Sequence, residues 1–407
     1  MLDLTKLAGQ LPDMGSHLQQ QAQEGRERMT NAQALLRAAQ ENFQTLQAQH
    51  QQWGDRLIFN YGVPIDPLDT RVMLPVPPQA HTVFATDGSQ IAPSHHEIAY
   101  CYLINVGRIM LHYGQGLHPL LDNVPEVFYR PEDLYVSRKW GIRTEEWMGY
   151  CRTASEAQML AEMACKWVLP PGSHAHIPNV AMVDGSLVFW FLENIPQEAR
   201  DRILMPVLEA WRNLRETRIP LLGYISSTRS VDAVHFLRLQ ACPHENPDCP
   251  THCLESDNGD RLPEFRDQLP CQSIEPLRDS SLWESQLQPG ERSGIWRSQS
   301  RILQMYPPED QTCFCYVHVG TEVARVEMPF WLTEDRELLD QSLGILLGQV
   351  HKGFGYPVAI AEAHNQAVIR GGDRARFFSL LEQQMVKAGL RNVGVSYKET
   401  LKRGSIA

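Results

Sequence analysis

The stretch that decides the fold is Val83-Phe-Ala-Thr-Asp-Gly-Ser-Gln-Ile91, an apolar run that carries one acid, Asp87, before a glycine. A second run, Val180-Ala-Met-Val-Asp-Gly-Ser-Leu-Val188, places Asp184 in the same local setting. We expect each run to be a short strand that stops at its aspartate and turns through the following glycine. Two buried acids without a cation would repel until one took up a proton, so the pair predicts a metal site.

The composition is that of a globular protein, with 407 residues, of which 43% are hydrophobic and 21% charged. The net charge of -11 provides no broad cationic field, which argues against a protein that coats nucleic acid. It does not argue against an enzyme that meets nucleic acid through a local groove and metals. We find no signal peptide or membrane span, so we expect a cytoplasmic protein with no membrane partner.

The hydrophobic periodicity predicts helices and strands in mixed order. An amphipathic helix is expected over residues 15–53, either packed on the body of the protein or serving as an arm for dimerisation or partner docking. Besides the stretch around Asp87, the expected strands are 97–107, 108–113, 180–188, 220–226, 313–319 and 322–328. The other expected helices are 143–169, 197–216, 230–239, 334–350 and one beyond residue 363. This order predicts an α/β fold with a mixed sheet flanked by helices, and acids at adjacent strand ends are typical of ribonuclease-H-like nucleases.

Further polar side chains could complete the metal site. Glu156 and Glu162 lie on the helix that leads into the Asp184 strand, and six residues apart they point in different directions, so at most one should face the site. Tyr356 and His364 lie in a segment of small residues, where His364 could ligate a metal or transfer protons. The alternatives are solvated helix acids for the glutamates and an ordinary packed histidine for His364.

Three residues are candidates for phosphate binding. Ser89 and Ser186 follow the two Asp-Gly pairs, where a serine hydroxyl can bind a phosphate or orient the carboxylate. Arg229 ends the segment Ser226-Ser-Thr-Arg229, between an expected strand and an expected helix, where free N–H groups and the guanidinium could hold a phosphate. An ordinary helix N-cap explains the same segment.

A polar segment at 242–290 is predicted to bind a structural zinc ion. The candidate ligands are Cys242, Cys249, Cys253 and Cys271, and His244 or His252 could replace one of them. A closed zinc site would order an insertion that has few apolar residues of its own. The chain has nine cysteines, an odd number, and their spacing favours thiols or metal ligands over disulfides.

Taken together, several segments resemble the NurA family of DNA-end-processing nucleases. They are ATDGSQ from residue 85, MVDGSL from residue 182 and GYPVAIAEAH from residue 355, together with YISSTRS and ARVEMPFWL. The resemblance covers nearly all of the chain beyond the N-terminal helix. It divides the chain into a helical arm and connector at 1–75 and a nuclease domain at 76–407, which contains the cysteine-bearing insertion. That insertion departs from the family pattern.

The resemblance implies a ribonuclease-H-like core and a homodimer. It also implies Mn²⁺ or Mg²⁺ as cofactor, DNA as substrate and a HerA-type hexameric ATPase as partner. Carried over residue by residue, Asp87 and Asp184 correspond to the family's metal-binding acids, and Tyr356 and His364 to its C-terminal tyrosine and histidine. Glu156 is the preferred helix glutamate and Glu162 the reserve.

The expected function is metal-dependent hydrolysis of DNA, as an exonuclease and single-strand endonuclease in end resection and repair. Two other classes remain open. A non-catalytic adaptor that docks on an ATPase would suit the acidic net charge, and a metal phosphatase would act on small phosphoesters and ignore DNA.

Overall fold

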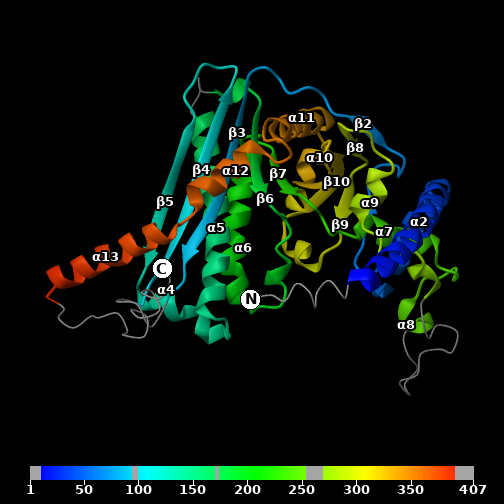
Figure 1. Ribbon diagram of the computed structural model, residues 1–407, viewed down its shortest axis with the longest axis horizontal. Helices are drawn as coiled ribbons and strands as arrows, with labels where there is room; N and C mark the ends of the chain where they lie inside the picture. The colour runs from blue at the N-terminus through cyan, green and yellow to red at the C-terminus, as the bar shows by residue number, and fades with distance from the viewer. Residues whose placement is uncertain (1–10, 94–99, 170–173, 254–268, 390–407) are drawn as a thin grey trace. The chain divides into compact units, whose positions relative to one another are not determined.

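The computed structural model describes residues 11–93, 100–169, 174–253 and 269–389. They form two compact units (Figure 1). Among the described residues, the first unit comprises 11–74, 225–253, 269–303 and 311–327, and the second comprises 75–93, 100–169, 174–224, 304–310 and 328–389. The predicted N-terminal arm therefore belongs to the same unit as the described parts of the cysteine-bearing insertion. None of the helices in the described ranges combines the length and the apolar character needed to cross a membrane.

The second unit is built on the strand order β7-β6-β3-β4-β5. The strands β3, β4 and β5 form an antiparallel meander, and Figure 1 shows them as long neighbouring arrows. The strand β6 lies parallel to β3 on its other side, and β7 lies parallel to β6. This is a ribonuclease-H-like arrangement, which confirms the predicted fold class. The bounds are His81–Ile91 for β3, Tyr102–Tyr113 for β4, Leu120–Phe128 for β5, Asn179–Asp184 for β6 and Leu221–Ile225 for β7.

Helices cover this sheet. The helix α5 packs against β3, β4 and α6, and α12 packs against β3 and β4. Small and apolar residues of α5, including Ala157, Leu160, Ala161 and Ala164, form its buried side. The helix bounds are Pro131–Tyr135 for α4, Thr144–Val168 for α5, Gln197–Glu216 for α6, Phe330–Thr333 for α10, Arg336–Lys352 for α11, Val358–Ala367 for α12 and Gly371–Lys387 for α13.

Two predicted turns are wrong. The strand β3 does not stop at Asp87, since Asp87 pairs with Gly107 and Gly88 pairs with Val106 within one unbroken ladder. The expected turn between 97–107 and 108–113 is also absent, because β4 runs straight through Gly107. Residues 94–99, where the first of these strands was expected to begin, lie outside the described ranges. The turn after the second acid is confirmed: β6 ends at Asp184, and Gly185 has a φ of 100°.

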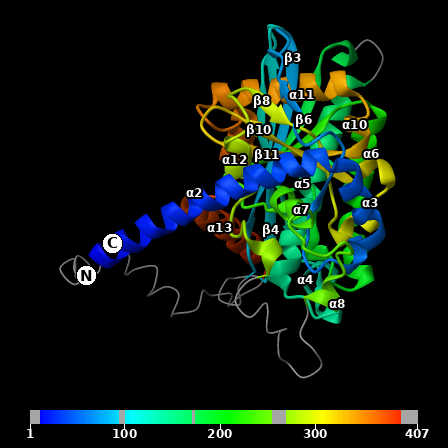
Figure 2. The same ribbon diagram turned by 90° about the vertical axis from the view of Figure 1, so that its right-hand side faces the viewer.

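The first unit packs helices against short strands. Its strand order is β1-β9-β10-β11, and β8 joins β2 to β10. The long helix α2 (Leu11–Glu41), seen along its length in Figure 2, packs on α7. Its side chains Ala32, Leu36 and Ala39 share one core with Phe236 and Trp296. The remaining bounds are Phe43–Trp53 for α3, Gly62–Pro64 for β1, Arg71–Met73 for β2, Asp232–Gln240 for α7, Cys249–His252 for α8, Asp279–Glu284 for α9, Glu291–Ser293 for β8, Trp296–Ser298 for β9, Thr312–His318 for β10 and Val323–Pro329 for β11.

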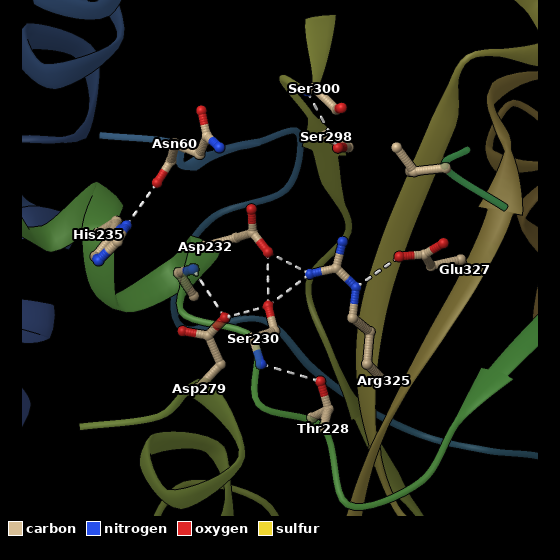
Figure 3. A network of polar contacts seen from close by, with 12 residues as sticks. Asn60, Thr228, Ser230, Asp232, His235, Asp279, Ser298, Ser300, Arg325 and Glu327 are labelled. Atoms are coloured by element: carbon tan, nitrogen blue, oxygen red, sulfur yellow. Dashed lines mark hydrogen bonds and ion pairs between the residues drawn. The ribbon is translucent and has the colours of Figure 1, made fainter. Parts of the chain in front are cut away.

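A buried polar network around Arg325 ties β11 to α7 and α9 (Figure 3). The Arg325 guanidinium donates to Asp232 at 2.5 Å, to Ser230 at 2.7 Å and to Glu327 at 2.8 Å. Asp279 accepts backbone N–H groups at the start of α7. Burial and the neighbouring charge of Asp232 raise the pKa of Asp279. Each buried charge in this network has a partner, as the low dielectric of a protein interior requires.

Candidate active site

The structure brings Asp87, Glu156, Asp184, Tyr356 and His364 into one neighbourhood of the second unit. The Nδ1 atom of His364 lies 2.8 Å from Oδ2 of Asp87. The Tyr356 hydroxyl is hydrogen-bonded to Asp184, and the charges of Asp87 and Asp184 both act on Glu156. These five are the residues that the sequence predicted as catalytic, and they come from β3, α5, β6, the α11–α12 loop and α12.

Asp87 is positioned by the middle of β3. It lies opposite Gly107 of β4, so both point to the same face of the sheet. On that face a Cβ atom at Gly107 would lie 2.4 Å from the backbone oxygen of Ala363 in α12. The glycine thus allows α12 to approach the sheet closely, and this approach carries His364 to Asp87. The other oxygen of Asp87, Oδ1, accepts the backbone N–H of Gly88 at 2.8 Å.

Glu156 fills the space that a side chain at position 88 would occupy. Successive residues of a strand point to opposite faces, so Gly88 points away from the face of Asp87 and toward α5. A Cβ atom at Gly88 would lie 2.2 Å from Oε1 of Glu156. The hydroxyl of Thr86 donates to the backbone oxygen of Glu156 at 3.0 Å, which fixes this turn of α5 on the strand. The glycine after Asp87 therefore admits a carboxylate and makes no turn.

The electrostatics of Glu156 fit a cation. Its Oε1 atom is shielded from solvent, and Nε of Arg152 lies 3.2 Å from it. Burial raises the pKa of Glu156 to about 8, against the opposing charge of Arg152 and with the help of the charges on Asp87 and Asp184. Asp87, Glu156 and Asp184 lie within electrostatic reach of one another, and carboxylate oxygens are the ligands that a hard divalent cation prefers, although no three such side chains in the described ranges are placed closely enough to hold one in this conformation.

Asp184 and Tyr356 form the other side of the site. Asp184 is exposed at the end of β6, and the following Gly185 turns the chain away. Burial and the hydrogen bond to Asp184 raise the pKa of Tyr356, so its hydroxyl stays protonated and donates to the carboxylate. The Tyr356 ring also meets the edge of Tyr224 at a centroid distance of 5.6 Å.

Several other predicted residues lie elsewhere or already have partners. Glu162 is 57% exposed and pairs with Lys166 on the surface of α5, so the structure does not group it with the five. The Ser89 hydroxyl donates to the backbone oxygen of Ala367, and the Ser186 hydroxyl accepts the N–H of Val188 at 3.0 Å. Arg229 belongs to the first unit and is exposed. Phosphate binding by these residues stays a prediction.

Two residues that shape the site were not among the predicted site residues. Arg152 contacts Glu156 from one helical turn away, and the four-residue spacing of an Arg–Glu pair was the available signal. Asn105 is buried and donates to the backbone oxygen of Ala367 at 2.8 Å, which holds the end of α12 beside Ser89. No local pattern marks Asn105, because its partner lies 262 residues away.

The four predicted zinc ligands lie within electrostatic reach of one another in the first unit. Their mutual influence is evident in the pKa of Cys253, which burial and the charges of Cys249, Cys271 and Cys242 raise to about 11. Cys249 and Cys271 are buried, and Nη2 of Arg238 lies 3.4 Å from the Cys271 sulfur. As they stand, no three or more His, Cys, Asp or Glu side chains in the described ranges are arranged to hold a metal ion.

The fold and these five residues define a ribonuclease-H-like protein with an acidic centre. The model of the NurA domain family matches residues 81–369, a span that contains all five. The chain belongs to the NurA family. Its fold is similar to the crystal structure of the NurA nuclease from Sulfolobus solfataricus, with a TM-score of 0.51 and 11% identity over 95% of this chain and 98% of that chain. A search of the curated proteins finds no match.

Proposed function

We propose that this protein is a metal-dependent deoxyribonuclease that hydrolyses phosphodiester bonds during DNA-end processing. Membership of the NurA family supports a nuclease role, and the NurA nuclease of Sulfolobus solfataricus shares the fold. The observation that carries the proposal is the buried Glu156 carboxylate, whose pKa the charges of Asp87 and Asp184 help to raise. We infer that Asp87, Glu156 and Asp184 hold Mn²⁺ or Mg²⁺, with His364 as a further ligand or proton carrier.

Each residue has a role that follows from its contacts. A bound divalent cation would supply positive charge against the phosphate and lower the pKa of water. His364 can donate from Nδ1 to Asp87, which leaves Nε2 to take up a proton from attacking water or to bind the cation. Tyr356 orients Asp184 through its hydroxyl. Glu156 adds its negative charge to those of Asp87 and Asp184.

The test is cleavage of single-stranded and blunt-ended DNA with Mn²⁺, Mg²⁺ or EDTA. Asp184→Asn should cut no more than the wild-type protein does in EDTA. Asp201→Asn, at a half-buried aspartate on α6, is the matched control and should cut normally. Metal-dependent cleavage of small phosphoesters without any cleavage of DNA would identify a phosphatase, and DNA binding without cleavage would identify an adaptor. Either result would refute the proposal.

We further propose that the protein acts as an exonuclease and single-strand endonuclease, as a homodimer, with a HerA-type ATPase as partner. These properties come from the family resemblance. Sedimentation of the purified chain, alone and mixed with the ATPase, tests the dimer and the partner. End-labelled and circular single strands distinguish the two modes of cleavage.

We also infer a structural zinc ion bound by Cys242, Cys249, Cys253 and Cys271. Thiols bind zinc only as thiolates, so ligand geometry forms together with deprotonation and metal uptake. The support is the electrostatic influence that these four cysteines, from three separate segments, exert on one another, and the burial of Cys249 and Cys271.

A further inference from the structure

Phe354 is an exposed aromatic side chain in the loop that also carries Tyr356. Its exposed fraction is 98%, higher than that of any other large hydrophobic residue in the described ranges. A fully solvated phenylalanine forgoes the burial that usually stabilises this residue type. The loop spans 353–356 between α11 and α12, so Phe354 lies two residues from a side chain that contacts the acidic centre.

The backbone holds Phe354 outward in a conformation that costs free energy. Its φ is 55°, in the left-handed region that residues with a side chain rarely adopt. Three hydrogen bonds enforce this geometry at the end of α11, from the N–H groups of 353, 354 and 355 to the carbonyls of Gln349, His351 and Val350. A Cβ atom at Gly353 would lie 1.9 Å from the oxygen of Tyr356, so the loop closes tightly on itself. The same closure presents Phe354 to solvent and Tyr356 to Asp184.

The net charge of the chain favours a DNA base as the group that the exposed Phe354 ring contacts. A protein of net charge -11 has no broad cationic field to attract a polyanion. The cation proposed above would supply positive charge only locally, so a contribution that does not depend on charge would strengthen DNA binding near the acidic centre. Stacking of a base on an aromatic ring is such a contribution, and it tolerates any sequence because every base has a π-face.

We propose that Phe354 stacks on an unpaired base next to the phosphate that is cut, so that the substrate is single-stranded or frayed DNA. This inference rests on the proposed nuclease function. It adds a specificity-determining residue that does not touch the reacting atoms. Paired bases inside a duplex offer no free face to Phe354, so the ring selects unpaired nucleotides.

The test is a double-mutant cycle between the protein and the DNA. Phe354→Ala should raise the KM for single-stranded DNA by on the order of 5- to 150-fold, the range of one lost base stack, with little change in kcat. An oligonucleotide with one abasic position beside the cut should raise the KM of the wild-type protein by the same factor. Phe354→Ala combined with the abasic oligonucleotide should raise the KM no further than either change alone. Phe354→Trp should restore the low KM.

Two controls separate stacking from other causes. Tyr129→Ala removes another exposed aromatic, just after β5, and should leave the KM unchanged. Phe354→Gly relieves the backbone conformation, so a thermal melt of this variant and of Phe354→Ala shows whether the fold is intact. Independent losses from Phe354→Ala and the abasic site would overturn the inference. So would an unchanged KM with altered sedimentation, which would make Phe354 a protein contact.

DNA binding is measured by fluorescence anisotropy beside cleavage. A chain that binds DNA but never cuts it refutes the proposed function, and the same cycle in binding affinity still decides the role of Phe354. A wild-type chain that does not bind single-stranded DNA refutes both.

Discussion

At the scale of single residues, the two Asp-Gly pairs look alike in sequence and differ in structure. Gly185 has a positive φ and ends a strand, whereas Gly88 stays inside β3. Gly88 leaves room for the Glu156 carboxylate, which a methyl group would displace. The sequence predicted that Asp87 and Asp184 meet, but the reason for the first glycine depends on a helix 68 residues further along the chain.

Gly88→Ala should therefore impair the site while leaving Asp87 in place. Its new methyl group would meet Oε1 of Glu156 at 2.2 Å and the Arg152 side chain at 2.6 Å, so both must move. We expect metal-dependent cleavage to fall by on the order of 10- to 100-fold, as when a group that orients a metal ligand is removed. Gly149→Ala, at an open position on the same α5 helix, is the control. Equal activity of the two variants would contradict this role for Gly88.

Glu156→Gln should change the pH dependence of stability in EDTA. The pKa of Glu156 is raised from its ordinary value of 4.5 to about 8, so without metal the folded chain retains this proton over a pH range where the unfolded chain releases it. The stability associated with the proton is present below pH 4.5 and is lost as the pH rises toward 8. Glutamine does not titrate. The melting temperature of the variant minus that of the wild type should grow by a few degrees between pH 5 and pH 8, and a constant difference would refute the shift.

At the scale of elements, α12 reaches the sheet because β4 carries a glycine opposite Asp87. The hydroxyl of Ser89 and the amide of Asn105 then hold its last carbonyl, that of Ala367. The sequence predicted β4 as two strands with a turn at Gly107, since glycine is also the commonest turn residue. Only the contact with α12 shows that this glycine serves close packing.

Gly107→Ala should displace α12 and with it His364. The added methyl group would lie 2.4 Å from the Ala363 oxygen and 2.6 Å from the Ala367 nitrogen, and backbone atoms cannot rotate away. We expect a loss of about 1–3 kcal/mol in the free energy of unfolding, typical of overpacking, together with reduced cleavage. Urea unfolding measures the first effect. Gly372→Ala, at an open position in α13, should show neither, and a fully active Gly107→Ala protein would disprove this role for the glycine.

At the scale of the whole molecule, the acidic centre lies in one compact unit and the four predicted zinc ligands lie in the other. The predicted division separated the chain into two continuous ranges at residue 75. In the structure, the first unit instead combines three separated segments in one core. The predicted domain range 76–407 remains a prediction about function.

Removal of zinc should therefore destabilise the first unit selectively. We expect about one zinc ion per chain by elemental analysis after dialysis against a weak chelator, and its loss in Cys249→Ser. Calorimetry should show a lower transition temperature for one part of the unfolding profile only, because metal binding stabilises the folded state of the unit that holds it. Cys315→Ser, a buried cysteine on β10, should retain the metal. A chain without zinc that melts like the zinc-loaded one would rule out the site.

The sequence by itself determined the α/β class and most helices and strands of the second unit, and it predicted the residues of the acidic centre. Hydrophobic periodicity and family motifs are local, so they can be recognised along the chain. Tertiary structure alone showed why Gly88 and Gly107 are glycines, and that the N-terminal arm shares a core with the middle of the chain. These outcomes depend on close contacts between atoms that are far apart in the sequence. Such contacts produce no local pattern of residues that could be recognised along the chain.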